Sequence, residues 1–192
     1  MPKNFAITSL GRSGTLFLKT QMNKSKQWTV RHEGSQDRFR LSLSKAQERL
    51  SKDFYGEVNG RLRFFIDDLV VDKKGVILRN PYDVLISTCN RTTPFLTVSL
   101  FERRCCYRIL DQQIEAGVPI IWFDKMTTDL DYLHSVLVDF GITDVGKDDL
   151  DFKKQNETEK EKKKFNDISD LNAEQIRRFD ESCGWFVKKY FS

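Results

Sequence analysis

The residues best suited to chemistry lie in a glycine-flanked loop near the N-terminus. The loop is Gly11-Arg12-Ser13-Gly14-Thr15, which follows an apolar run and precedes a helical pattern. At such a junction, backbone amides point toward a bound anion, and the start of the helix adds about half a positive charge. The spacing is shorter than that of a Walker loop, and the lysine of that motif is absent. The loop therefore predicts a phosphate-type site and disfavours a magnesium-dependent triphosphatase.

A second candidate anion site is the segment "RNPYDVLIS". Arg79 ends an apolar run, and Ser87 follows eight residues later, one to two turns into the next predicted helix. An arginine fork and a serine hydroxyl at this spacing could reach a common anion near the strand end. The alternative is a surface arginine beside a solvent-facing serine.

The segment "VRHEG" offers two candidates for a general base. His32 and Glu33 leave the second predicted strand at the same edge of the sheet as the glycine loop, within reach of an acceptor. Glu33 is the favoured base and His32 the second choice, and the alternative is a polar strand end. His134, the other histidine, lies on an amphipathic helix, where we expect it to pack or to face solvent.

Helical and extended patterns alternate along the chain. Strands are predicted at Phe5–Ser9, Trp28–Gly34, Leu62–Ile66, Val76–Leu78 and in "VPIIWFD". Helices are predicted at Ser13–Asn23 and Leu41–Leu50, from Pro81 onward, at Leu96–Ala116, and in "MTTDLDYLHSVLVDFGI". This alternation predicts an α/β fold, a three-layer α/β/α sandwich around a mostly parallel sheet, whose ligands bind beyond the carboxyl ends of the strands.

The C-terminal part of the sequence contains a charged segment followed by a helical pattern. Residues 151–165 form a charge run that predicts a solvated linker or a lid, and residues 170–191 predict a final helix capped by Asp170 or Asn172. With 192 residues, the chain is expected to form a single domain over residues 1–192.

The composition indicates which kinds of ligand and which cellular location to expect. A net charge of +4, spread among acids, does not demand nucleic acid and suits a small anionic ligand. The apolar run near the N-terminus is too short for a secretory signal or a membrane span, so we expect a cytoplasmic protein. The four cysteines lack the spacing of a zinc site or a disulfide framework, so buried thiols and no metal are expected.

Together, "GRSGTLF" and "RNPYDVLIS" resemble the two nucleotide-binding motifs of the sulfotransferase superfamily that uses 3′-phosphoadenosine-5′-phosphosulfate (PAPS). The late strand and helix beginning at "VPIIWFD" are also similar, so the resemblance spans Phe5 to about Ile142. The basic "RKG" signature found near the C-terminus of cytosolic members is absent. The resemblance implies transfer of a sulfuryl group to an acceptor hydroxyl, less favourably an amine, without a metal and with 3′-phosphoadenosine-5′-phosphate (PAP) as product.

The resemblance also implies a role for each matching residue. Arg12 would stabilise charge on the bridging oxygen as the sulfuryl group leaves, and Phe17 falls where cytosolic relatives often carry an aromatic that stacks on adenine. Arg79 and Ser87 would hold the 3′-phosphate. Ser13, Gly14, Thr15 and Leu16 would hold the 5′-phosphate through amides and hydroxyls, and Gly11 and Arg12 are also expected to bind the cofactor.

Two alternatives stay open at the level of sequence. A P-loop nucleotide or small-molecule kinase would need a lysine after Gly14 and a magnesium-holding acid, for which Asp67 and Asp68 are the candidates. A non-catalytic nucleotide-binding module would have the same nucleotide-binding loops, but His32 and Glu33 would take no part in a reaction. The acceptor, expected to be a small molecule or a glycan, would be selected by loops at Tyr55–Arg61 and Pro94–Arg104, and neither its identity nor the oligomeric state is encoded in a motif.

Overall fold

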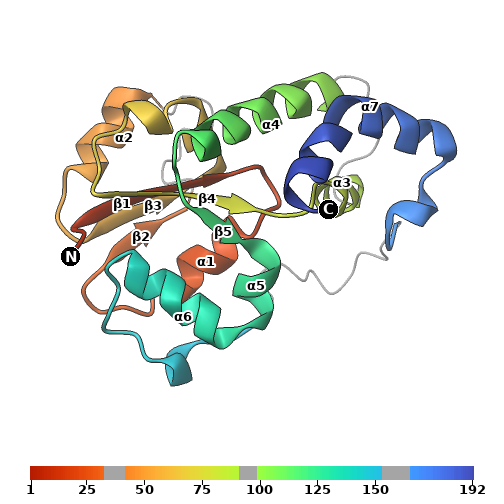
Figure 1. Ribbon diagram of the computed structural model, residues 1–192. Helices are drawn as coiled ribbons and strands as arrows, with labels where there is room; N and C mark the ends of the chain where they lie inside the picture. The colour runs from red at the N-terminus through yellow and green to blue at the C-terminus, as the bar shows by residue number, and fades with distance from the viewer. Residues whose placement is uncertain (33–41, 91–98, 153–164) are drawn as a thin grey trace.

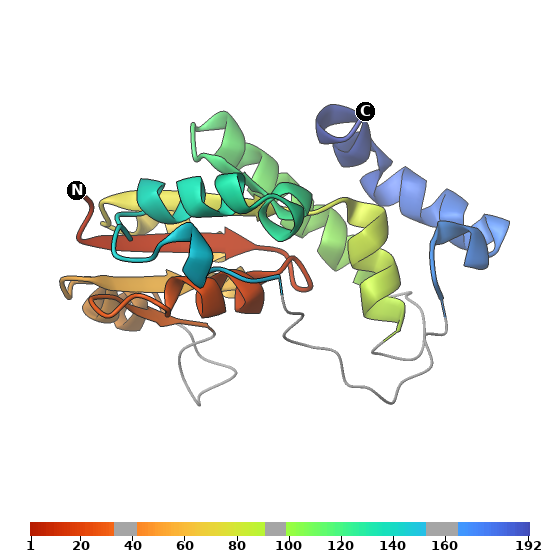
Figure 2. The ribbon, with the colours of Figure 1, turned by 90° about the horizontal axis from the view of Figure 1, so that it is seen from below.

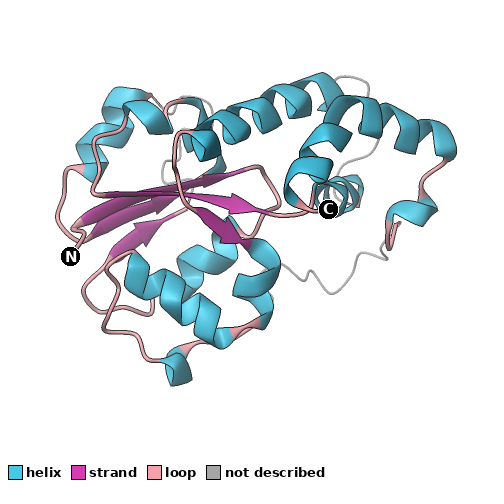
Figure 3. Cartoon of the chain, viewed as in Figure 1, coloured by secondary structure: helices cyan, strands magenta, loops and turns pink. Residues whose placement is uncertain are grey.

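Among the described residues, five parallel strands form the central sheet, in the order β2-β3-β1-β4-β5 (Figures 1 and 3). The strands are β1 (Asn4–Ser9), β2 (Thr29–Arg31), β3 (Tyr55–Val58), β4 (Lys73–Leu78) and β5 (Ile120–Trp122). This computed structural model describes residues 1–32, 42–90, 99–152 and 165–192. Every described strand pair is parallel, so the predicted α/β fold is confirmed and the sheet is more uniform than expected.

Helices cover both faces of the sheet (Figures 1 and 2). One face carries α1 (Thr15–Met22), α5 (Phe123–Thr128) and α6 (Leu130–Asp139). The other face carries α2 (Leu43–Leu50) and α4 (Ser99–Glu115). Beyond the carboxyl ends of the strands lie α3 (Pro81–Cys89) and α7 (Ala173–Tyr190). These layers form the three-layer sandwich that the alternating pattern predicts.

Side chains of the central strands pack against helices on both faces of the sheet. Phe5 and Ile7 of β1 pack with α1 and α6, whereas Ala6 between them packs against α2. Successive side chains of a strand point to opposite faces, so a run apolar at every position fills two cores. Burial of each large aliphatic or aromatic side chain contributes about 1.5–3 kcal/mol.

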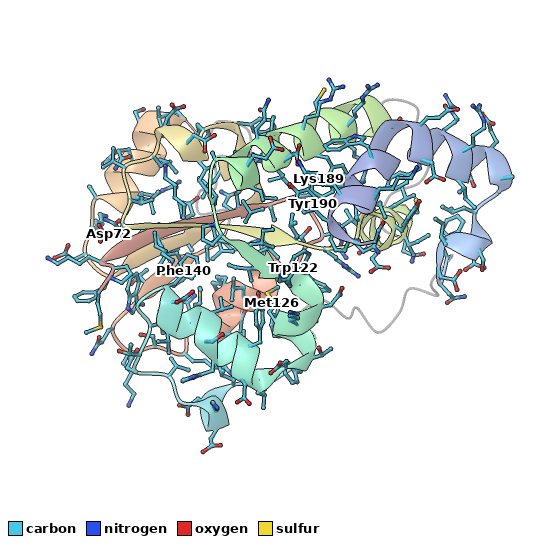
Figure 4. The ribbon with its side chains drawn as sticks, viewed as in Figure 1. Asp72, Trp122, Met126, Phe140, Lys189 and Tyr190 are labelled. Carbon is cyan, nitrogen blue, oxygen red and sulfur yellow. The ribbon has the colours of Figure 1, made fainter. Side chains whose placement is uncertain are left out.

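The pairing of β1 with β3 depends on a glycine. Phe5 is the register partner of Gly56, and a Cβ added at Gly56 would lie 2.1 Å from the Phe5 ring. The ring also contacts Trp28 and Phe140, with centroid separations of 5.1 and 5.2 Å. Met126 and Phe140 lie on this same face of the sheet (Figure 4). Gly56 therefore leaves space for the aromatic cluster of Phe5, Trp28 and Phe140 on the α1 face of the sheet.

The prediction of a strand at Leu62–Ile66 is wrong. These residues form the 3₁₀ helices η1 (Gly60–Phe64) and η2 (Ile66–Asp68), and the strand lies earlier, inside the segment expected to be an acceptor loop. Asn59 ends β3 and starts η1, because its side chain accepts a hydrogen bond from the Arg61 amide at 2.9 Å. A short apolar run does not by itself distinguish a strand from a helical turn.

The remaining elements differ from prediction mainly at their ends. The expected helix in "MTTDLDYLHSVLVDFGI" is two helices, because Asp129 adopts an extended conformation, ends α5 and caps α6 by accepting from the Tyr132 amide at 3.0 Å. The final helix begins after Asn172, which forms the predicted cap with Gln175. Most of the predicted linker or lid, 153–164, lies outside the described residues.

Candidate functional site

The glycine loop lies at a switch point of the sheet. The chain leaves β1 toward β2 on one side and leaves the adjacent β4 toward β5 on the other. Such a divergence opens a crevice at the carboxyl ends of the strands, where α/β proteins bind ligands. The loop after β1 and the residues after β4 therefore meet where an anion site is expected.

The loop is held in a conformation that ordinary residues rarely adopt. Arg12 has φ of 70° and Gly14 has φ of 80°, and Gly14 is the N-cap of α1. A left-handed conformation costs a residue with a Cβ about 1–2 kcal/mol, so the surrounding contacts must hold Arg12 in place.

Arg12 is fixed by both residues of the second predicted motif. Its backbone carbonyl accepts a hydrogen bond from Arg79 Nη1 at 2.9 Å, and its side-chain Nε donates to Ser87 Oγ at 3.0 Å. The structure thus brings Arg79 and Ser87 to the glycine loop across more than sixty positions of sequence, and their binding of a common anion stays a prediction. The three side chains form one polar cluster, which we call the arginine clamp: Arg12, Arg79 and Ser87.

Phe123 joins the loop to the clamp, and no sequence motif identifies it. The Arg79 guanidinium carbon lies 4.4 Å from the centre of the Phe123 ring, within the range of a cation–π contact. A Cβ added at Gly14 would lie 2.6 Å from the same ring. The available sequence signal was an aromatic residue placed directly after a buried strand at the carboxyl edge of the sheet.

Burial shapes the electrostatics of the clamp. It lowers the pKa of Arg79, opposed by the nearby carboxylates of Asp83 and Asp124. Burial also raises the pKa of Asp124, with Asp83 adding to that shift and Arg79 opposing it. Arginine stays protonated at any physiological pH. The buried Arg79 Nε has no hydrogen-bond partner among the described residues, so this guanidinium retains a donor that an anion could use.

His32 lies at the same edge of the sheet, as predicted. It directly follows β2, and its Nε2 lies 2.8 Å from the hydroxyl oxygen of Thr15, the first residue of α1. Which of the two atoms donates depends on the histidine tautomer. Glu33, the favoured base, lies outside the described residues. His134 is half-buried on α6, consistent with a packing role.

The other predicted nucleotide contacts divide into two groups. Gly11 is exposed, Leu16 is half-buried, and Ser13 and Thr15 are buried, with 2% and 9% of their surface exposed. Phe17 belongs to the core on the α1 side of the sheet, with 9% of its surface exposed. Its role in stacking on adenine stays a prediction, which this burial does not favour.

The acids considered for a kinase lie away from the loop. Asp67 and Asp68 are exposed on η2, and the Asp67 carbonyl accepts from the side chain of Lys74, at the beginning of β4, with a separation of 2.9 Å. The loop lies at the opposite ends of these strands. Across the described ranges, no group of three or more His, Cys, Asp or Glu side chains is placed to hold a metal ion. None of the helices in those ranges has the length and apolarity needed to cross a membrane.

Comparison with known proteins gives no family assignment. No protein-family model matches the chain, and no curated protein matches it. The interpretation of the site therefore depends on its residues and their geometry.

Proposed function

We propose that the protein is a PAPS-dependent sulfotransferase that transfers a sulfuryl group to an acceptor hydroxyl, or less favourably to an amine. The observation that supports this function is the arginine clamp, in which Arg79 and Ser87 both contact Arg12 in the glycine loop. Two fixed cations beside a loop of backbone amides suit a nucleotide that carries anionic groups at two separate positions. PAPS has this distribution of charge, with a 5′-phosphosulfate and a 3′-phosphate.

The glycine loop and the arginine clamp would bind different phosphate groups of the nucleotide. Amides of Ser13, Gly14 and Thr15 would bind the 5′-phosphate at the start of α1, where the helix dipole favours negative charge. Arg79 and Ser87 would bind the 3′-phosphate. Sulfuryl transfer, like phosphoryl transfer, depends mainly on positioning and charge stabilisation.

In the reaction, the acceptor oxygen forms a bond to sulfur while the bond between sulfur and the bridging phosphate oxygen breaks. The Arg12 guanidinium would stabilise the negative charge that develops on that oxygen, which leaves as part of PAP. Glu33 or His32 would accept the proton of the acceptor hydroxyl. The contact of His32 with Thr15 supports His32 as a candidate for this role.

Calorimetric titration tests the nucleotide assignment. PAP should bind tightly without magnesium, and ATP with magnesium should bind much more weakly. Equal or stronger binding of ATP would contradict the sulfotransferase proposal and favour a kinase. PAP binding without any transfer activity would indicate the non-catalytic module.

A transfer assay with labelled PAPS and a panel of sugars, phenols and lipids tests the chemistry. Glu33→Gln should abolish transfer while leaving PAP affinity unchanged, and His32→Gln should do so instead if histidine is the base. Glu48→Gln, at an exposed position of α2, is the matched control and should retain full activity. The cytoplasmic location and the single-domain organisation stay predictions.

A further inference from the structure

Three arginine side chains line one cavity beside the glycine loop. The cavity has a volume of about 230 Å³. It is lined by Leu10, Gly11, Arg12, Arg63, Thr88, Arg103 and Cys106. Pockets that enclose a whole drug-sized ligand measure about 300–1,000 Å³, so this cavity suits one group of a larger ligand. We call it the arginine cavity.

The three arginines come from three separate elements. Arg12 lies in the loop after β1, Arg63 on η1 and Arg103 on α4. Arg63 is held in place, since its Nη1 donates to the Gly60 carbonyl and its Nε lies 3.2 Å from Cys106 Sγ. The guanidinium also lies 4.4 Å from the centre of the neighbouring Phe64 ring. A cation fixed in this way is already arranged for a ligand.

Two of these arginines have no acidic partner among the residues that the structure describes. In the part of the chain that the structure describes, neither Arg63 nor Arg103 forms an ion pair, and the buried Arg103 Nε has no hydrogen-bond partner. Arg49, in contrast, pairs with the buried Glu57 carboxylate at 3.0 Å. The guanidinium groups of Arg63 and Arg103 therefore favour binding of a carboxylate, sulfate or phosphate, which a guanidinium can contact with two parallel hydrogen bonds.

We infer that the arginine cavity binds an oxyanion of the acceptor, so that the substrate is an anionic hydroxyl compound such as a sugar acid or an already sulfated or phosphorylated sugar. This inference depends on the proposed function. Arg79 does not line the cavity, so the 3′-phosphate assigned to it occupies a different place. Arg12 lines the cavity and is the residue proposed to act on the bridging oxygen, so an acceptor anchored there would lie next to the group that is transferred.

Anion binding can be measured directly with inorganic sulfate as the probe. Protein saturated with PAP should bind sulfate, and Arg103→Gln should weaken that binding about tenfold, as loss of one hydrogen bond to a charged group predicts. Arg104→Gln, at the adjacent exposed position of α4, is the matched control and should leave it unchanged. Arg103→Lys, which keeps the charge, should lose less, and it replaces Arg103→Gln if that variant fails to fold.

Transfer assays that compare charged and uncharged acceptors test whether the bound anion belongs to the acceptor. With labelled PAPS, glucuronate and glucose 6-sulfate should each be sulfated with a lower KM than glucose, and Arg103→Gln should raise KM about tenfold for the anionic acceptor alone. Unchanged sulfate binding in Arg103→Gln would overturn the inference. Weaker PAP binding in that variant would also overturn it, because the cavity would then belong to the nucleotide.

The outcomes separate this inference from the proposed function. If the wild-type protein fails to bind PAP, the proposed function is wrong. The sulfate titration of nucleotide-free Arg103→Gln against Arg104→Gln then still decides whether the cavity binds anions. If PAP binds and the glucose derivatives show no preference for an anion, only the inference fails.

Discussion

Replacing Arg79 by alanine should remove the ability of the protein to distinguish PAP from adenosine 5′-monophosphate, which lacks the 3′-phosphate. A hydrogen bond to a charged group contributes about 1.5–3 kcal/mol, so loss of the contact with the 3′-phosphate should weaken PAP binding about 10- to 150-fold. The monophosphate should lose much less, because it has no group that reaches Arg79.

The same substitution also perturbs the free protein. Arg79 donates to the Arg12 carbonyl at 2.9 Å and stacks on Phe123 at 4.4 Å. Loss of the hydrogen bond costs about 1.5–3 kcal/mol and loss of the cation–π contact about 0.5–2 kcal/mol. We therefore expect the free energy of unfolding to fall by about 2–5 kcal/mol. The comparison of two nucleotides cancels the part of this effect that acts through the loop.

The assay is calorimetric titration of PAP and of the monophosphate into wild-type protein and Arg79→Ala, with urea denaturation of each. Arg108→Ala, at an exposed position of α4, serves as the arginine control. The reasoning is refuted if Arg79→Ala weakens both nucleotides by the same factor. Arg79 would then act only by holding the loop, and the 3′-phosphate would be bound elsewhere.

Two further predictions concern stability. Gly14→Ala should lower the free energy of unfolding by about 2–4 kcal/mol in urea, since φ of 80° costs about 1–2 kcal/mol and the new Cβ would lie 2.6 Å from Phe123; a loss below about 1 kcal/mol would contradict the described packing. Burial raises the pKa of Tyr82 to about 12, assisted by its hydrogen bond to Asp180 at 2.5 Å. Because the folded-state pKa lies above the ordinary value of 10, the free energy of unfolding should fall as pH rises from 10 to 12; Tyr82→Phe should lose less over that interval, and an equal loss would refute this coupling.

Local patterns predicted most of the strands and helices and identified Arg12, Arg79 and Ser87 as candidates, and the resemblance of their two motifs to one family predicted that these residues act together. Arg12, Arg79 and Ser87 lie in short motifs at the ends of strands, and parallel strands bring such ends together. β3 was missed because Gly56 and Glu57 weaken its pattern, and both depend on distant residues. Gly56 makes room for Phe5, and Glu57 is buried against Arg49.

The arginine cavity was not predicted for a similar reason. Arg63 and Arg103 belong to no motif, and they meet only because η1 and α4 pack beside the loop. Their charges look like ordinary surface charges in the sequence. The docking of α7 is equally non-local, since Lys189 and Tyr190 reach Asp111 of α4 at 2.7 and 2.6 Å. Figure 4 labels Lys189 and Tyr190 at the end of α7.

The contact between Gly14 and Phe123 couples two positions that are more than a hundred residues apart. A Cβ at position 14 would collide with the Phe123 ring and with Met126 Cε, so it requires a smaller ring at position 123 and a shift of Met126. A smaller residue at position 123 removes the surface on which Arg79 stacks. In homologous sequences the three positions should therefore vary together. Homologues with a bulky residue at position 14 should carry an aliphatic residue at position 123 and a residue other than arginine at position 79. Positions 14, 79 and 123 together would then identify homologues that have lost the anion site.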